Sequence, residues 1–238
     1  MKSELDDATF GPGTVRALVE AASRDGVAAA GGELEFRSGP TGFSLGQRAY
    51  RWLEHRLRSA ESALGVCVRT DATCTAYRKS LWEPIEAFED LDQSFPFVAR
   101  RAGLRVVIAE GAKVTDEPNV TARQELRARA RMTRKTLLSF RRRWGLRDAL
   151  RHPGFTLAFV NHKLVRFLSP VAVAGLLVAL GWVGGLPVRI GLALLLFASI
   201  ALPRIFPFSL LHAFLVANAG FALGVVQWFT GDRSGSIR

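Results

Sequence analysis

The segment 88–109, FEDLDQSFPFVARRAGLRVVIA, joins an acidic turn, a helix and a strand. Its carboxylates gather at the start, where the helix dipole favours negative charge. We expect the helix to pass through Phe97 and Val98 and to end at Gly103, because glycine commonly follows a helix C-terminus. The branched apolar run 104–109 predicts the clearest β-strand in the chain.

The chain before this segment alternates helices and strands in the same way. A Gly-Pro-Gly turn at 11–13 predicts the start of a short amphipathic helix, and small residues at 27–36 predict a strand. A longer helix is expected from Ser44, and residues 65–77 are expected to form buried extended backbone. Alternating elements of this kind are typical of an α/β fold, which we assign to residues 1–120.

The chain after this segment changes composition abruptly. Residues 121–167 are rich in arginine and are expected to form basic amphipathic helices at a membrane interface. Three apolar stretches follow at 168–186, 188–202 and 208–229, against the roughly 20 residues that a spanning helix needs. We therefore expect two or three transmembrane helices within 168–230 and a short tail at 231–238. The number of crossings stays open.

The net charge of +11 comes largely from the arginine-rich block. Because this block directly precedes the apolar stretches, anionic lipid headgroups are its expected partner, and nucleic acid is not. We expect a multi-pass membrane protein whose α/β part is cytoplasmic. Cys67 and Cys74 lack metal-ligand spacing and are expected to be reduced structural thiols. The first residues lack the apolar segment of a cleavable signal peptide.

Several short motifs occur in a characteristic order. They are DAT at 7–9, ED at 89–90, R-x-x-G-x-R-V at 100–106, Q-x-x-R at 124–127 and H-K-x-x-R at 162–166. In this order they resemble a membrane-bound family 2 glycosyltransferase of the GT-A type, from its metal-binding turn onward. The resemblance implies a partial GT-A domain, the C-terminal part of the catalytic domain, followed by a membrane anchor. The nucleotide-binding half of such a domain is expected either from a longer reading frame or from a separate polypeptide, and the chain alone is expected to catalyse poorly.

The resemblance assigns roles to three acidic residues. Asp90 would be the general base that removes the proton of the acceptor hydroxyl. Glu89 would orient the acceptor or support the loop. Asp7 would bind a divalent metal, Mg²⁺ or Mn²⁺, that neutralises the leaving diphosphate. From the residues alone, Asp7 is equally consistent with an acidic helix N-cap, and Glu89-Asp90 is better explained by an ordinary acidic first turn of a helix.

The resemblance also implies substrate-binding residues. Asp71 would bind a sugar hydroxyl of the acceptor, although a surface turn explains it nearly as well. Arg127 and Arg131 would meet a diphosphate or lipid phosphate through bidentate hydrogen bonds. Ala128 stands where processive members of the family carry tryptophan, so processive synthesis is not expected.

The first functional hypothesis is an inverting glycosyltransferase of cell-envelope polysaccharide synthesis. It would transfer a sugar from a nucleotide-diphosphate donor to a lipid-linked or glycan acceptor. The alternative is a non-catalytic membrane scaffold or a decayed remnant of such an enzyme. A third hypothesis, a peripheral module held to anionic lipid, leaves the ED pair unexplained.

Overall fold

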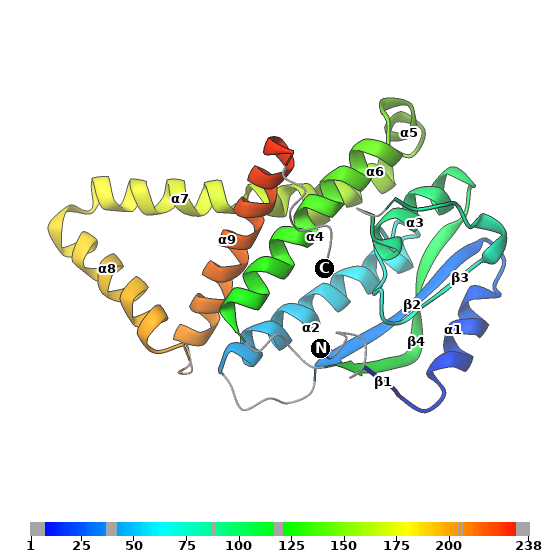
Figure 1. Ribbon diagram of the computed structural model, residues 1–238, viewed down its shortest axis with the longest axis horizontal. Coiled ribbons are helices and arrows are strands. Elements are labelled where there is room, and N and C mark those ends of the chain that lie inside the picture. The colour runs from blue at the N-terminus through cyan, green and yellow to red at the C-terminus, as the bar shows by residue number, and fades with distance from the viewer. Residues whose placement is uncertain are drawn as a thin grey trace.

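The computed structural model describes residues 8–36, 42–86, 89–116, 121–203, 205 and 207–231, without the side chains of 42–47. A sheet covered by helices forms one end of the molecule, and a helical arm forms the other (Figure 1). The helix α4 (Ala122–Arg143) runs between the two ends.

The sheet has four strands in the order β1-β4-β2-β3. They are β1 (Thr9–Phe10), β2 (Val27–Phe36), β3 (Thr75–Tyr77) and β4 (Arg105–Asp116). The long strands β2 and β4 pair in parallel, whereas β1 and β3 join the two edges antiparallel. A parallel central pair covered by helices is the mixed α/β arrangement that the alternation of elements predicted.

Small residues let other parts of the chain approach the central strand. Residues 27–32 of β2 are buried. A Cβ atom at Gly31 would lie 2.8 Å from the Thr70 side chain, so the extended segment 66–71 packs directly on the strand. This close approach explains why β2 carries alanine and glycine rather than branched residues.

Three helices enclose the sheet: α1 (Thr14–Ala22), α2 (Gly42–Ala63) and α3 (Leu91–Arg101). Helix α1 packs on β2 and β4 through Leu18 and Ala21. Helix α3 places Phe95 and Ala99 against Cys67 and the start of β2. Cys67 and Cys74 are both free and buried, as expected from the sequence.

Helix α4 (Ala122–Arg143) begins with a capping box between Thr121 and Gln124. It is followed by α5 (Leu146–Arg151), α6 (Pro153–Phe159) and a π-helical turn, η2 (Val160–Leu164). An aromatic cluster joins α3 to these elements. Its members are Phe97, Phe140, Trp144, Phe155 and Phe159.

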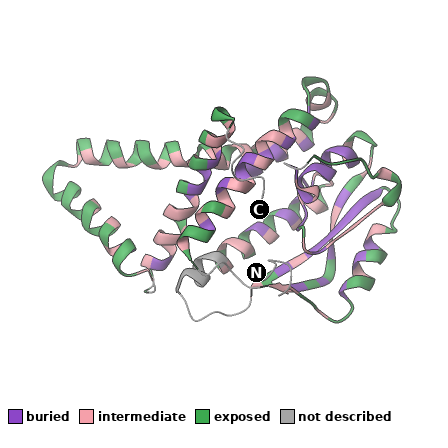
Figure 2. Ribbon diagram, in the orientation of Figure 1, coloured by how far each residue is buried: buried purple, intermediate pink, exposed green. Residues whose placement is uncertain are grey.

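The arm contains α7 (Val165–Val183), α8 (Gly185–Ala201) and α9 (Phe208–Thr230). Figure 1 shows α7 and α8 projecting away from the body, while α9 returns alongside α4. Residues 153–183 and 208–230 are long and apolar enough to cross a membrane, whereas α8 has 17 residues. The outward surfaces of α7 and α8 are largely exposed (Figure 2).

Most elements fall where the sequence predicted them. The predicted strand at 27–36 and the helix through Phe97 are confirmed. The last strand is longer than the expected 104–109 and continues to Asp116. Within residues 65–77, which were expected to be extended, only Thr75–Tyr77 pairs with a neighbouring strand, as β3. The 3-10 turn η1 (Lys79–Leu81) follows it.

Candidate functional site

The acidic start of α3 presents one accessible carboxylate. Asp90 is the N-cap residue, and its side chain is 31% exposed. Its Oδ1 lies 2.6 Å from Lys135 Nζ on α4, and its Oδ2 accepts a hydrogen bond of 3.2 Å from Gln93 Nε2.

The neighbouring Glu89 is buried and held by Arg143 of α4. Arg143 donates from Nε to Oε1 and from Nη2 to Oε2, both over 2.7 Å. Burial raises the pKa of Glu89, but the hydrogen bonds from Arg143 outweigh it and hold the pKa below its usual value. This bidentate pair fixes the loop before α3 to α4 and thereby fixes the position of Asp90.

Two more buried carboxylates lie next to this helix start. Arg69 Nε donates to Asp92 Oδ2 over 3.0 Å, and burial raises the pKa of Asp92 despite that partner. Asp71 is paired with Arg51 at 3.0 Å and with Arg58 at 3.5 Å. Burial alone would raise the pKa of Asp71, but these two arginines hold it below its usual value.

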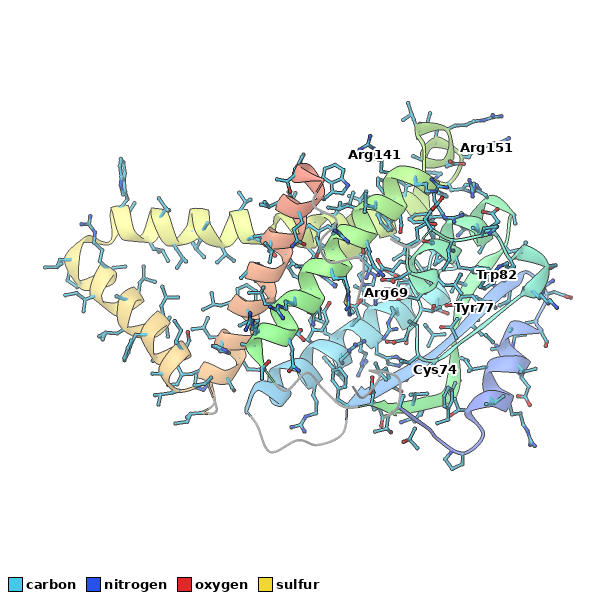
Figure 3. The ribbon with its side chains drawn as sticks, in the orientation of Figure 1. Arg69, Cys74, Tyr77, Trp82, Arg141 and Arg151 are labelled. Atoms are coloured by element: carbon cyan, nitrogen blue, oxygen red, sulfur yellow. The ribbon has the colours of Figure 1, made fainter. Side chains whose placement is uncertain are left out.

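These arginines line a small polar pocket of about 50 Å³ between α2, the 66–71 segment and α4. Figure 3 labels Arg69 in this region, between the ribbons of α2 and α4. The lining residues are Phe36, Tyr50, Arg51, Glu54, Arg58, Arg69, Asp71, Glu125, Ala128, Arg129 and Met132. Four arginines against three carboxylates give the lining a net positive charge.

Arg58 is the most enclosed of the four arginines. Its side chain is 1% exposed, and its Nη2 has no hydrogen-bond partner among the described residues. A buried guanidinium donor without a partner is costly, because the donor loses its hydration and gains nothing in return. Since Arg58 lines the polar pocket, the spare donor indicates a place for an anion.

A larger apolar cavity of about 380 Å³ adjoins the polar pocket and shares Tyr50, Glu125 and Arg129 with it. The remaining lining residues come mainly from the arm: Leu53, Arg166, Ser169, Leu210, Ala213, Phe214, Ala217, Asn218 and Phe221. Helix α9 therefore forms one wall of the cavity. The guanidinium carbon of Arg129 lies 4.2 Å from the Tyr50 ring centroid, and that of Arg166 lies 5.4 Å from it. These three residues form the polar end of the cavity.

A buried ionic cluster fastens the start of the arm to α2. His162 contacts Glu61 through Nδ1 at 2.6 Å and Glu54 through Nε2 at 2.9 Å. Glu54 also pairs with Lys163 at 3.2 Å and with Arg166 at 3.0 Å. His162 and Lys163 of the H-K-x-x-R motif are therefore buried in the protein interior, and Arg166 is half-buried. The π-helical turn brings His162 and Lys163 to the same carboxylate.

The residues that the sequence singled out fall into separate places. Glu89 and Asp90 lie together at the start of α3, and Asp71 lines the polar pocket. Arg127 is exposed and Arg131 half-buried on α4, and neither lines the pocket or the cavity. Asp7 lies outside the described residues.

The described part of the chain contains no group of three or more His, Cys, Asp or Glu side chains placed to hold a metal ion. The carboxylates near the pocket are instead neutralised by arginine or lysine. The described residues therefore do not by themselves fit a divalent metal, and no catalytic step is derived through one.

The sequence reasoning missed the residues that form the pocket, namely Tyr50, Glu54, Arg58, Arg69 and Arg129. A signal for three of them was present in the sequence. Glu54 and Arg58, like Glu125 and Arg129, are spaced four residues apart on a helix, so each pair shares one face. That face is buried in both helices, whereas Arg127 points to solvent.

Comparison with known proteins yields a match by structure alone. No protein-family model matches the chain, and no curated protein sequence matches it significantly. A solved structure, the mannosyltransferase PcManGT from Pyrobaculum calidifontis in complex with GDP-Man and Mn²⁺, superposes with a TM-score of 0.61 at 16% sequence identity. The match covers 94% of this chain and 59% of that chain. The chain therefore has a glycosyltransferase-like mixed α/β fold.

Proposed function

We propose that this chain is part of a glycosyltransferase that moves a sugar from a nucleotide-diphosphate donor to a lipid-linked or glycan acceptor. The observation that carries the proposal is the accessible carboxylate of Asp90 at the start of α3, within a fold similar to that of a mannosyltransferase. Because the sequence motifs follow each other in the order typical of that group, we propose that the fold is of the GT-A type and that the enzyme belongs to family 2.

Asp90 acts as the general base in this proposal. Its neighbours Glu89 and Asp92 are buried and paired with arginine, so they cannot reach an acceptor. Asp90 is partly exposed, and a carboxylate in that state can take a proton from an attacking oxygen. Attack from the side opposite the leaving diphosphate inverts the anomeric centre.

The other side chains position Asp90 or the substrates and take no part in the reaction itself. The Glu89–Arg143 pair fixes the loop that carries Asp90. Asp71 belongs to the polar pocket, where it orients Arg51 and Arg58 toward an acceptor group. Arg127 and Arg131 lie elsewhere on α4, and we retain them as candidates for donor or headgroup phosphate on the outer face of that helix.

The solved structure of the similar mannosyltransferase is a complex with GDP-Man and Mn²⁺. We propose a nucleotide-diphosphate sugar as the donor here too, with GDP-mannose as the first to test. Asp7, in the DAT motif of residues 7–9, is proposed as a ligand of Mg²⁺ or Mn²⁺. Such a metal would neutralise charge on the leaving diphosphate.

The arm is proposed to hold the protein in the membrane as a multi-pass anchor, with the α/β part cytoplasmic. Helix α7 exposes large apolar side chains around its circumference, including Val171 at 72%, Trp182 at 86% and Val183 at 89%. Such a surface is stable in lipid rather than in water. Arg141 and Arg151 are exposed, and Figure 3 shows them pointing away from the body, where they can meet anionic headgroups.

A non-catalytic scaffold is the second candidate. It is favoured by the ion pair between Asp90 and Lys135 at 2.6 Å, which occupies one carboxylate oxygen. A base must release such a partner or share it when the acceptor binds. A scaffold would have no need to do so.

Sugar transfer tests the proposal directly. Membranes from cells expressing the chain within its full reading frame are supplied with labelled nucleotide sugars, GDP-mannose first, and the products are separated into lipid and glycan fractions. We expect label in one of these fractions. Membranes in which no donor is consumed would favour the scaffold.

A further inference from the structure

We propose that the polar pocket and the apolar cavity together form one binding site for a membrane lipid that ends in a phosphate monoester, and that this lipid is the acceptor. This inference rests on the proposed function and names its acceptor class. The phosphate occupies the polar pocket beside Arg58 and Arg129. The apolar chain occupies the cavity between α2 and α9.

The size of the polar pocket selects a small anionic group. At 10–15 Å³ for each water, about 50 Å³ holds roughly three or four waters, which suits a phosphate and is far too small for a glycan. The four arginines of the lining provide the positive charge, and Arg58 Nη2 is a buried donor without a partner among the described residues. A phosphate oxygen would supply the missing acceptor.

The adjoining cavity selects an apolar chain. Its volume of about 380 Å³ is more than twice the roughly 150 Å³ of a cavity that takes up benzene, so it has room for about a dozen carbon atoms. Its wall comes from Leu210, Ala213, Phe214, Ala217 and Phe221 of α9.

The location of the cavity indicates where the chain comes from. Its walls include α7 and α9, and each belongs to a segment long and apolar enough to cross a membrane. A lipid can therefore enter the cavity from the bilayer without passing through water. The residues shared by pocket and cavity, Tyr50, Glu125 and Arg129, mark the point where head and chain meet.

The start of α3 connects this site to the proposed chemistry. Arg69 lines the polar pocket and is bonded to Asp92, two residues after Asp90. In the transfer, a phosphate oxygen forms the bond to the anomeric carbon as the bond from that carbon to the nucleotide diphosphate breaks. A phosphate monoester has its second pKa near about 6, so near neutral pH it attacks largely as the dianion, and Asp90 takes a proton from the monoanion that predominates below that pH.

Binding is measured without any donor, so that failure of sugar transfer and failure of this inference are separate results. The full chain in detergent micelles is titrated with farnesyl monophosphate, with farnesol and with inorganic phosphate. We expect saturable binding of farnesyl monophosphate. Farnesol alone and inorganic phosphate alone should each bind at least about tenfold more weakly. Equal binding of farnesol would overturn the phosphate assignment.

Paired variants locate the site. Ala217→Phe fills the cavity, whereas Ala219→Phe places the same side chain on the exposed face of α9. Arg58→Lys keeps the charge beside Asp71 but removes the spare donor, and Arg123→Gln removes an exposed charge from α4. We expect Ala217→Phe to weaken binding about tenfold or more, because the phenyl ring takes the space of the lipid chain. We expect Arg58→Lys to weaken it by a similar factor, as loss of one hydrogen bond to a charged group does. The two controls should bind normally.

Each outcome is decisive for the lipid site. If Ala217→Phe binds farnesyl monophosphate as the parent does, the cavity is not the chain site, even where sugar transfer to another acceptor is observed. If the lipid binds as predicted and no transfer occurs with any donor, the site stands as a lipid site and the proposed enzyme fails.

Discussion

Arg143 holds Glu89 by two parallel hydrogen bonds of 2.7 Å, and the carboxylate of Glu89 is completely buried. Arg143 also pairs with Glu83 at 2.8 Å and donates to the carbonyl oxygen of Pro84 at 3.0 Å. One side chain near the end of α4 thereby holds Glu83, Pro84 and Glu89, all of which precede α3. The position of Asp90 depends on this attachment.

Arg143→Met should lower the free energy of unfolding by about 3 to 5 kcal/mol, because it leaves a buried carboxylate without a partner. Arg142→Met is the matched control. Arg142 also bonds a glutamate, Glu86, but both side chains are about half exposed, so the loss should be about 1 kcal/mol or less. Thermal unfolding in detergent compares the two. Equal shifts in melting temperature would show that the Glu89 pair does not fix the segment.

The stability of the folded chain should fall in acid through Asp71 and Glu54. Burial raises the pKa of each, but the charges of Arg51 near Asp71 and Lys163 near Glu54 leave both values below normal. A lowered pKa contributes stability above the ordinary value of about 4, and that stability is lost as the pH falls through the folded value. Melting temperature is measured from pH 7 down to pH 3.

Two substitutions should change this pH dependence in opposite directions. Asp71→Asn should reduce the fall in melting temperature between about pH 4 and pH 3, because it removes a group with a lowered pKa. Asp92 has a raised pKa, which makes the folded state less stable as the pH rises from about 4 toward 7. Asp92→Asn should therefore enlarge the gain in melting temperature between about pH 4 and pH 7. Parallel curves for both variants and the parent would contradict the assignment.

Helix α9 should separate from α4 when a methyl group is added at Gly224. A Cβ atom there would lie 2.6 Å from the carbonyl oxygen of Ala130, and backbone cannot move aside as a flexible side chain can. Gly191→Ala on α8 is the control, since a Cβ atom there meets nothing within 4 Å. We expect trypsin to cleave α4 faster only in Gly224→Ala. Protection equal to the parent would mean that α9 does not pack on α4 as described.

Trp182 on α7 should lie in lipid. Its side chain is 86% exposed in the protein, so its surroundings are set by what covers the arm. Brominated lipids in nanodiscs should quench a fraction of the tryptophan fluorescence that is missing in Trp182→Phe. If the two proteins are quenched by the same absolute amount, Trp182 is in water and the proposed anchor is wrong.

The sequence predicted the elements better than it predicted the site. Helical and strand periodicity placed β2, α3 and the apolar helices, because each of these patterns is local. The polar pocket depends on α2, the 66–71 segment and α4 meeting in space, and no local pattern specifies that meeting. The arginine-rich α4 shows the difference. The spacing of Glu125 and Arg129 places them on one face of the helix, but only the folded structure shows that this face lines the pocket while Arg127 faces solvent.

The H-K-x-x-R motif shows a similar limit. Its cations suggested an interface with lipid headgroups, yet His162 and Lys163 are buried against Glu54 of α2, more than a hundred positions away in the chain. A carboxylate so distant cannot be assigned as a partner from one sequence. The family likeness, in contrast, rested on the order of short motifs, and order is visible without contacts.

Asp90 is proposed to take the acceptor proton in sugar transfer, and its replacement tests that role. Transfer from GDP-mannose and other nucleotide sugars is compared between the parent, Asp90→Asn and Lys135→Gln at a pH at which the acceptor nucleophile carries its proton, with donor binding measured in parallel. We predict that Asp90→Asn binds donor normally but transfers at least about a hundredfold more slowly, in line with the loss of a general base. We predict that Lys135→Gln retains transfer. Transfer by Asp90→Asn at the parent rate would contradict the assignment of Asp90 as the base.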